Sequence, residues 1–220
     1  MKWDGKEISV WRENSGGANG LRFDKDGSLL VCEGGNRRVT RVAMDDQKVA
    51  VLADGYDGKK FNGPNDLCLD AKGGLYFTDP CYGNRKLMEQ DKEAVYYIPP
   101  DGGKIVRVAD DLVRPNGIEM GKECLFIADH GGGKVYTYAM NPDGTLKDKK
   151  EFAAAACDGI KLDGQGNLYG ATGKGVAIFD PEGKKLNVIK IPGGPSNLCF
   201  DGNVMYITAG KSFFSIERRH

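Results

Sequence analysis

The sequence predicts an all-β fold, a β-propeller built as a single domain over residues 1–220, on three observations. A strand–turn–strand pattern occurs five times, its copies lie about 40–50 residues apart, and no stretch has the periodicity of a long helix. Repeats made only of strands at this spacing are typical of propeller blades. The length also suffices for one domain with a sizeable core.

The stretch 61–83 shows the repeated unit most clearly. Large apolar residues recur at every second position in Leu67–Asp70 and Leu75–Thr78, which predicts two short strands, and Gly73 and Gly74 permit a tight turn between them. A lone hairpin is only marginally stable in water, so this unit is expected to stack on its copies. The five predicted hairpins span Ala18–Glu33, Pro64–Asp79, Pro115–Asp129, Cys157–Thr172 and Pro195–Ala209.

Between the hairpins the sequence predicts the two outer strands that a four-stranded blade requires. These pairs are Val39–Ala43 with Lys48–Ala53, Ala94–Ile98 with Lys104–Ala109, Lys134–Met140 with Lys149–Phe152, and Gly175–Asp180 with Lys185–Ile191. Ser212–Glu217 is predicted as the last strand, and only Lys6–Arg12 is predicted as a strand before the first hairpin. Five full hairpins are thus accompanied by a fragment of a sixth blade. We predict a six-bladed β-propeller whose first blade is incomplete at the N-terminus, with Lys6–Arg12 as its outer strand; the alternative is a ring that closes in an atypical way.

Charge and composition limit the partners. The chain has 31 Lys and Arg and 31 Asp and Glu, with no block of like charge, which argues against nucleic-acid and membrane-surface binding. No apolar run approaches the roughly 18 residues of a membrane helix. The oligomeric state is not indicated.

The cysteines bear on metal binding and on the cellular compartment. Six cysteines without a C-x-x-C pair and two histidines offer few ligands for zinc. We interpret Cys68 and Cys199, at equivalent points of the repeat, as free buried thiols, which favours a cytoplasmic location. An upstream segment could still carry a signal peptide.

Each hairpin begins with an amide or carboxylate side chain. The first strand of a propeller blade lines the central channel, so these side chains are expected to converge at one end of it. They are Asn19, Asn65, Asn116, Asp158 and Asn197. A set of oxygen ligands without sulfur or imidazole predicts a hard-cation site, with Ca²⁺ first and Zn²⁺, Mn²⁺ and Mg²⁺ as alternatives. Asp158, the one carboxylate, could be a metal ligand or the base that activates water.

Turn formation is the competing explanation, because Asn and Asp also stabilise turns and bind channel waters. Asn65 and Asn197 keep the side-chain oxygen without a following glycine, which favours a role for the oxygen itself. We expect the acidic residues that end three second strands to cap turns, and His130, in a glycine-rich loop, to be solvated. Those acidic residues are Glu33, Asp79 and Asp129.

Four runs of the sequence resemble the gluconolactonase and senescence-marker-protein (regucalcin-like) family of six-bladed propellers. They are GPNDLCLDAKGGLYFTDPCYG, RPNGIEMGKECLFIADH, CDGIKLDGQGNLYG and GGPSNLCFDG, in this order over nearly the whole chain. The resemblance implies a lactone hydrolase that depends on a divalent metal, with relatives that hydrolyse organophosphates at the same site.

By position, Asn116 and Asp158 resemble the metal ligands of this family, Asn65 resembles its residue at the metal and substrate, and Asp158 resembles its proposed base. We also expect Asn19 to contact the substrate. The remaining ligand in the family is the Glu of a Glu-Gly-Pro motif in the first blade, which this sequence lacks. This agrees with the incomplete first blade predicted above, and we expect weak metal binding from the 220 residues alone.

The sequence thus predicts a hydrolase of the gluconolactonase type that opens a small sugar lactone or related lactone. The cation would polarise the carbonyl while Asp158 takes a proton from the attacking water. Two alternatives stay open: a catalytically silent propeller that serves as a binding scaffold, and a phosphotriester hydrolase that uses the same metal site.

Overall fold

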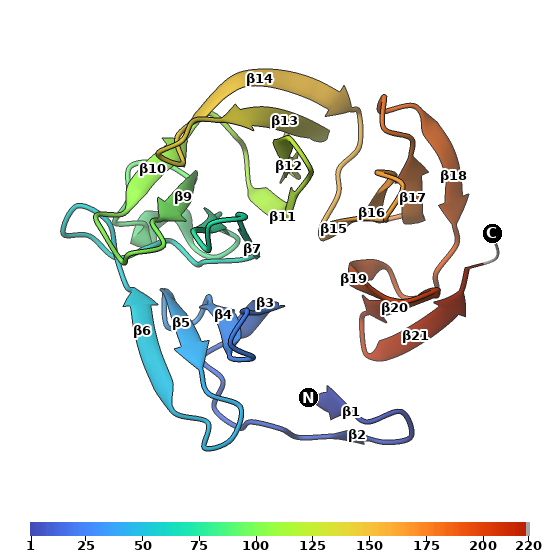
Figure 1. Ribbon diagram of the computed structural model, residues 1–220, viewed down its shortest axis with the longest axis horizontal. Coiled ribbons are helices and arrows are strands. Elements are labelled where there is room, and N and C mark those ends of the chain that lie inside the picture. Colours follow the sequence, from blue (N-terminus) through green and yellow to red (C-terminus); the bar gives the residue numbers. More distant parts are fainter. Residues whose placement is uncertain (219–220) are drawn as a thin grey trace.

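The structure, a computed structural model, describes residues 1–218 and confirms an all-β propeller. Five antiparallel sheets surround a central axis, each with its first strand innermost (Figure 1). The first three sheets are β3 (Ala18–Phe23), β4 (Leu29–Glu33), β5 (Arg38–Val42) and β6 (Val49–Ala53); β7 (Leu67–Leu69), β8 (Leu75–Asp79), β9 (Ala94–Ile98) and β10 (Val106–Ala109); and β11 (Pro115–Met120), β12 (Cys124–Asp129), β13 (Lys134–Met140) and β14 (Leu146–Ala153). The last two are β15 (Ile160–Leu162), β16 (Leu168–Thr172), β17 (Gly175–Phe179) and β18 (Lys185–Ile189); and β19 (Pro195–Asp201), β20 (Val204–Ala209) and β21 (Ser212–Glu217).

All five predicted hairpins are present, and their strands pair as expected: β3 with β4, β7 with β8, β11 with β12, β15 with β16, and β19 with β20. The predicted outer strands also occur, with ends displaced by a few residues. The alternating pattern therefore located the strands correctly, because each strand has one apolar side to bury.

The prediction for the N-terminal segment is wrong. Residues 6–12 do not form one outer strand; instead β2 (Ile8–Ser9) pairs with β1 (Lys2–Trp3) in a separate two-stranded sheet. The Asp4 side chain accepts hydrogen bonds from the backbone N–H groups of Lys6 and Glu7, and Gly5 has φ 100°, so the chain turns back on itself here. Within residues 1–218, five sheets of three or four strands surround the axis, so the predicted number of six blades is not confirmed.

The core lies between successive sheets. Leu67, Leu75 and Phe77 of the second sheet, for example, pack against Leu30 and Cys32 of the first sheet in one buried cluster. The next three interfaces repeat this arrangement. Each of the last four sheets therefore buries one face against the preceding sheet, which fixes the inner strands around the axis.

The expectation of buried thiols holds for Cys68 but is wrong for Cys199. All six cysteines are free; Cys68 is buried against the third sheet, whereas Cys199 is exposed. The physical reason is the alternation along β19: Leu198 and Phe200 pack against the preceding sheet, whereas Cys199 lies between them on the other face and lines an open cavity. No helix among residues 1–218 has the length and apolar character needed to cross a membrane.

Candidate functional site

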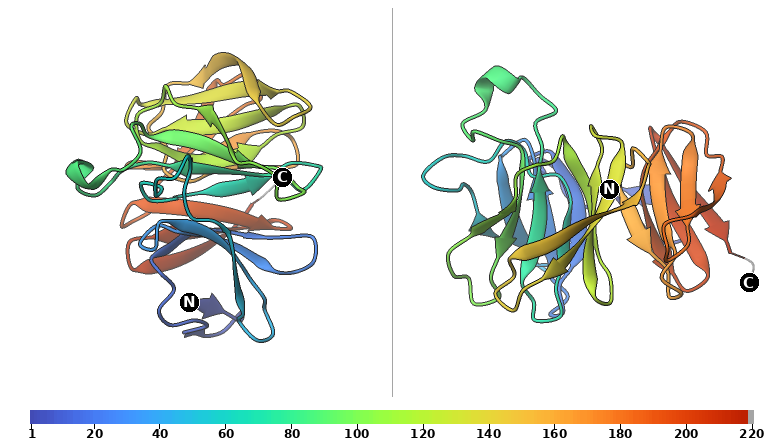
Figure 2. Two further views of the ribbon diagram at one scale, coloured as in Figure 1. Left: turned by 90° about the vertical axis from the view of Figure 1, so that its left-hand side faces the viewer. Right: turned by 90° about the horizontal axis from the view of Figure 1, so that it is seen from above.

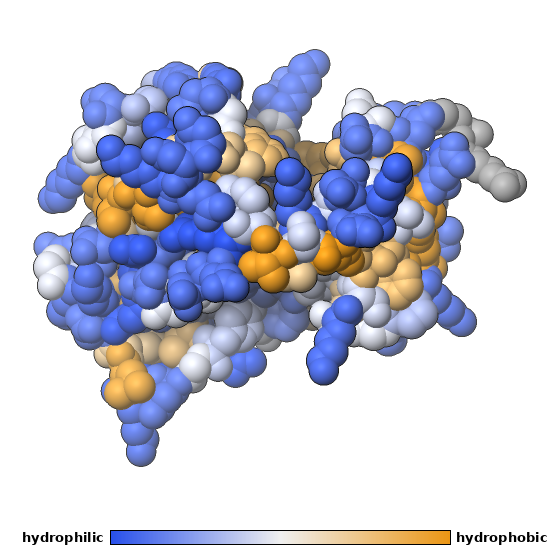
Figure 3. All heavy atoms as spheres, turned by 90° about the horizontal axis from the view of Figure 1, so that it is seen from below, coloured by the Kyte–Doolittle hydropathy of each residue, from blue (hydrophilic) through white to orange (hydrophobic). Residues whose placement is uncertain are grey.

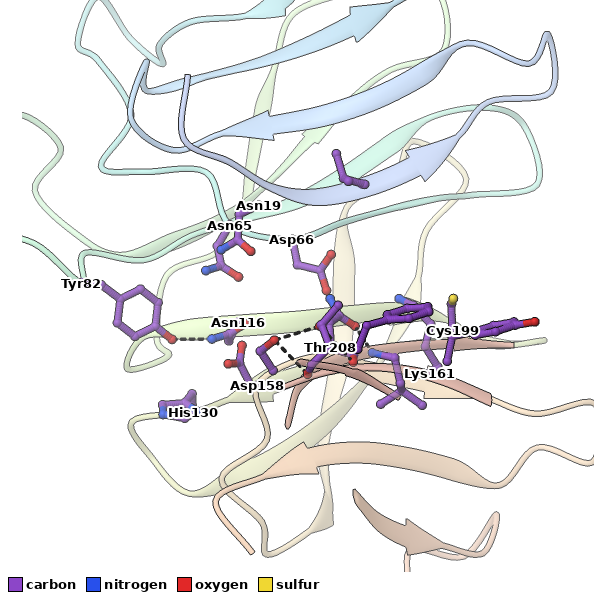
Figure 4. A pocket seen from close by; sticks show the side chains of 16 residues that line it. Asn19, Asn65, Asp66, Tyr82, Asn116, His130, Asp158, Lys161, Cys199 and Thr208 are labelled. Carbon is purple, nitrogen blue, oxygen red and sulfur yellow. Dashed lines mark hydrogen bonds between the residues drawn. The ribbon is translucent and has the colours of Figure 1, made fainter. Parts of the chain in front are cut away.

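The five Asn and Asp side chains that begin the hairpins meet at one cavity. The cavity has a volume of about 580 Å³ and is lined by side chains from all five hairpins (Figure 4). Asn65 and Asn116 are buried, Asp158 is half-buried, and Asn19 is exposed. The structure thus brings together every site residue expected from the sequence, namely Asn19, Asn65, Asn116 and Asp158.

Backbone hydrogen bonds between neighbouring sheets hold these residues in place. Gly20 N donates to Asn65 O at 2.7 Å and Gly117 N donates to Asp158 O at 3.0 Å. The Thr78 hydroxyl makes the equivalent bond to the Asn116 carbonyl oxygen at 2.8 Å. The backbone carbonyls of Asn65, Asn116 and Asp158 therefore bind the neighbouring sheet, and their side chains are left for the cavity.

Two of the glycines that follow these residues are needed for the close approach of the next inner strand. A Cβ on Gly20 would lie 2.6 Å from Asn65 O, and one on Gly117 would meet the carbonyl oxygen of Asp158. Residue 66 can be Asp because the bond to the next sheet is made there by Thr78. The type of residue that follows each Asn or Asp therefore depends on how closely the next sheet approaches at that position.

We predict that Gly117→Ala lowers the free energy of unfolding by about 1–3 kcal/mol, the usual cost of overpacking. The new Cβ would meet Asp158 O and lie 2.7 Å from Ile160 N, both backbone atoms that cannot rotate away. Urea unfolding measures the change. Gly164→Ala is the matched control, because no heavy atom lies within 4 Å of its Cβ; equal stability of the two variants would contradict the argument.

Asp158 has the environment of a group that exchanges a proton. Burial raises the pKa of its carboxyl above the ordinary value of 3.8, while the charge of His130 and a hydrogen bond with Asn116 oppose the increase. Asp66 adds a smaller contribution that raises this pKa. A carboxylate with a raised pKa beside polar groups in a cavity is a common arrangement for a general base.

Tyr82 and His130 complete this end of the cavity. The Asn116 Nδ2 donates to the Tyr82 hydroxyl at 2.6 Å, and the His130 Nδ1 lies 3.1 Å from the Cys157 carbonyl oxygen. The carbonyl can only accept, so Nδ1 carries the proton in this bond. The expectation of a solvated His130 is wrong, because the ring is half-buried and lines the cavity.

A charged cluster lies further along the channel wall. Glu119 accepts two hydrogen bonds from Arg22, at 3.0 and 3.1 Å, and one from Lys161 at 2.8 Å. Lys161 and Asp66 line the cavity, and the Oδ2 atom of Asp66 is buried without a hydrogen-bond partner among the described residues. Burial raises the pKa of Asp66, and the charge of Lys161 opposes this increase.

The three acidic residues that end second strands bind loop groups, as expected. Asp79 accepts from the N–H groups of residues 62 and 63, and Asp129 from those of residues 113 and 132. Glu33 accepts from Asn36, Arg38 and Thr40. These carboxylates fix the loops at the cavity end, and their oxygens already accept hydrogen bonds from the protein.

The cavity offers oxygen donors for a cation. Within residues 1–218, no three His, Cys, Asp or Glu side chains gather at a metal-binding distance. Asn65, Asn116 and Asp158 instead provide two amide oxygens and one carboxylate, and the bond from Asn116 Nδ2 to Tyr82 leaves its Oδ1 available. This donor set fits a hard cation, for which the remaining ligands would be waters or substrate.

Sequence reasoning missed Tyr82, Asp66 and Lys161. Tyr82 lies in the connection 80–93, which is much longer than the equivalent connections of the other sheets, and this length is a signal that was present in the sequence. Lys161 stands three residues after Asp158, as Glu119 does after Asn116 and Arg22 after Asn19. The repeat therefore placed these three charged residues at equivalent positions, which could have predicted that they meet.

Comparison with known proteins gives the same family from sequence and from structure. The SMP-30/Gluconolactonase/LRE-like region matches residues 1–211. A gluconolactonase from Zymomonas mobilis is 32% identical over 227 residues and matches 92% of this chain. A lactonohydrolase from Aspergillus oryzae is 28% identical over 84% of this chain. The solved structure of a gluconolactonase from Xanthomonas campestris superposes with a TM-score of 0.88 and 33% identity, over 95% of this chain and 74% of that one.

The chain is shorter than these relatives. It spans 64% of the length of the Zymomonas gluconolactonase and 52% of that of the Aspergillus lactonohydrolase.

Proposed function

The chain belongs to the SMP-30/gluconolactonase/LRE-like family, and from this membership we propose that the protein is a hydrolase that opens a lactone, with a sugar lactone of the gluconolactone type as substrate. The observation that carries the proposal is the cavity in which Asp158, with its raised pKa, lies among amide groups from neighbouring inner strands. Relatives with gluconolactonase and lactonase names support the substrate class.

In the proposed reaction, Asp158 removes a proton from water as the water oxygen attacks the lactone carbonyl carbon. The ring C–O bond then breaks, and the leaving oxygen takes a proton to give the hydroxy acid. Asn19 and Asn65 would contact the substrate, since both line the cavity. The reaction needs no serine or cysteine nucleophile.

We propose Ca²⁺ as the cofactor, held by Asn65, Asn116 and Asp158. The support is the oxygen-only donor set on one cavity wall, with a single carboxylate. When bound, such a cation supplies Lewis-acid polarisation of the carbonyl. A site with one carboxylate is expected to bind Ca²⁺ weakly, because ligand charge sets much of the affinity.

We further propose that the complete ring is six-bladed, with β1 and β2 in the sixth sector. Leu21 of β3 is 54% exposed, whereas the equivalent Leu67, Ile118, Ile160 and Leu198 are at most 4% exposed. Hydrophobic residues are visible among hydrophilic ones on the face of the molecule seen from below Figure 1 (Figure 3). A sheet packed on β3 would bury Leu21 in the way that the other sheets bury its equivalents.

The test of the proposed function is proton release from glucono-δ-lactone, with and without added Ca²⁺, corrected for spontaneous hydrolysis. Hydrolysis that requires the metal supports the proposal. Turnover of a phosphotriester but no lactone would favour the phosphotriester hydrolase. Absence of turnover with either substrate and every metal would favour the binding scaffold.

A further inference from the structure

The loop between β8 and β9, residues 80–93, is built differently from its counterparts. In the other sheets the second and third strands are joined by residues 34–37, 130–133, 173–174 and 210–211. The 80–93 loop instead contains the 3-10 turn η1 (Arg85–Leu87) and projects from the ring (Figure 2). It begins where β8 ends, which is the end of the hairpin at which Asn65 lies, so it reaches the cavity.

Hydrogen bonds fix this loop to the body of the protein. The buried carboxylate of Glu93 accepts from Cys81 N at 2.8 Å and from Arg114 N at 3.2 Å, and it pairs with Arg85. The placement of Tyr82 therefore does not depend on the tip of the loop.

The Tyr82 side chain points to the polar end of the cavity (Figure 4). Its hydroxyl accepts from Asn116 Nδ2 at 2.6 Å, its ring meets the His130 ring edge-on at 6.3 Å between centroids, and the Arg114 guanidinium lies 6.0 Å from its centroid. Asp158 lies beside the same Asn116 and lines the same cavity (Figure 4). Tyr82 and Asp158 thus flank one amide at the place where the reacting carbonyl would lie.

The phenolic proton of Tyr82 is available to a ligand. Asn116 occupies an acceptor position of the hydroxyl oxygen, and among residues 1–218 no group accepts the O–H. A phenol carries its proton at neutral pH, so this hydroxyl can donate a hydrogen bond. An uncommitted donor in a cavity is a suitable partner for a carbonyl oxygen that gains negative charge.

We propose that Tyr82 is a catalytic residue whose hydroxyl donates a hydrogen bond to the carbonyl oxygen of the bound lactone. This inference rests on the hydrolase function proposed above. As the water oxygen bonds to the carbonyl carbon and Asp158 takes the proton, the carbonyl electron pair moves to oxygen. The Tyr82 O–H stabilises that oxyanion without transferring its proton. When the ring C–O bond breaks, the carbonyl re-forms and the leaving oxygen takes the proton from Asp158.

The test compares Tyr82→Phe with the wild-type chain. The variant keeps the ring contacts with His130 and Arg114 and removes only the hydroxyl. We expect kcat to fall about 100-fold, as for loss of one oxyanion donor, with KM changed by about twofold or less. Tyr136→Phe is the matched control, because Tyr136 lies on β13 and outside the residues that line the cavity; its kinetics should not change.

Two further measurements separate the donor role from other roles. Calorimetric titration with Ca²⁺ alone should give the same affinity for Tyr82→Phe and wild type. A loss of Ca²⁺ affinity with unchanged kcat at saturating metal would overturn the proposal and make Tyr82 a positioning residue for Asn116. If the melting temperature of Tyr82→Phe fell together with its kcat, the proposal would likewise be overturned in favour of a structural role.

A readout without turnover distinguishes this inference from the proposed function. The lactam analogue of gluconolactone has a carbonyl oxygen but resists hydrolysis, and Tyr82→Phe is expected to bind it on the order of tenfold more weakly than wild type. Equal lactam affinity contradicts the donor role even in an active enzyme. A wild-type chain that binds the lactam through Tyr82 but hydrolyses no lactone contradicts the proposed function and leaves the donor supported.

Discussion

Replacing Asp158 with asparagine is expected to lower kcat/KM for lactone hydrolysis about a thousandfold, within the range for loss of a general base. Asparagine keeps the size of the side chain but cannot take a proton from water. It also removes the one carboxylate from the predicted cation site, so Ca²⁺ affinity should fall too. Steady-state rates of proton release and calorimetric Ca²⁺ titration measure the two effects separately.

The matched control is Asp201→Asn, a carboxylate at the exposed end of β19 that does not line the cavity. It should leave both quantities unchanged. If Asp158→Asn retained wild-type activity at saturating Ca²⁺, Asp158 could not be the base, and the proposed reaction would need another group for this step.

The pH dependence of the wild-type chain and of Asp158→Asn tests the role of Asp158 as a base in a second way. Because Asp158 acts only when ionised, kcat/KM should decline as pH falls through its raised pKa, above the ordinary 3.8, and Asp158→Asn should lack this decline.

The effect of Asp158 on stability has the opposite pH dependence. A folded-state pKa above the unfolded one means that stability from this group is present at low pH and is lost as pH rises through the folded pKa. Asp158→Asn should therefore be no less stable than wild type at neutral pH.

The local part of the site could be predicted from the sequence. Asn65, Asn116 and Asp158 each begin a hairpin, and the repeat places equivalent positions around one axis, so their convergence follows once a propeller is assumed. The boundaries of β11, β12 and β13 follow from the period of two in the same way. These features depend on short-range patterns and on symmetry.

Features without a repeat could not be predicted in this way. Tyr82 reaches Asn116 because Glu93 binds backbone groups at residues 81 and 114, contacts that no periodic pattern encodes. The N-terminal hairpin depends on the Asp4 turn and on Trp3, which packs against Phe213 with ring centroids 5.4 Å apart. The last contact joins the two ends of the chain.

Glu119→Gln is expected to lower the free energy of unfolding by about 3–5 kcal/mol, the cost of removing one partner from a buried ion pair. The Glu119 side chain is 8% exposed and binds both Arg22 and Lys161. Burial lowers the pKa of each cation, but nearby carboxylates outweigh it, so both pKa values are raised. The carboxylate is Glu119 for Arg22, and Asp66 together with Glu119 for Lys161. The neutral amide would leave two cations close together with little solvent.

Guanidinium chloride would screen this repulsion, so urea unfolding at low salt is the appropriate measurement. Glu151→Gln is the matched control, since Glu151 pairs with Lys134 at 2.6 Å on the exposed face of the third sheet. That exposed pair is expected to contribute little, because water already solvates both charges. Equal, small changes in the two variants would mean that the channel cluster does not stabilise the fold. A large change in Glu119→Gln that sodium chloride partly reverses would identify cation repulsion as its cause, because a cavity or packing defect does not respond to screening in this way.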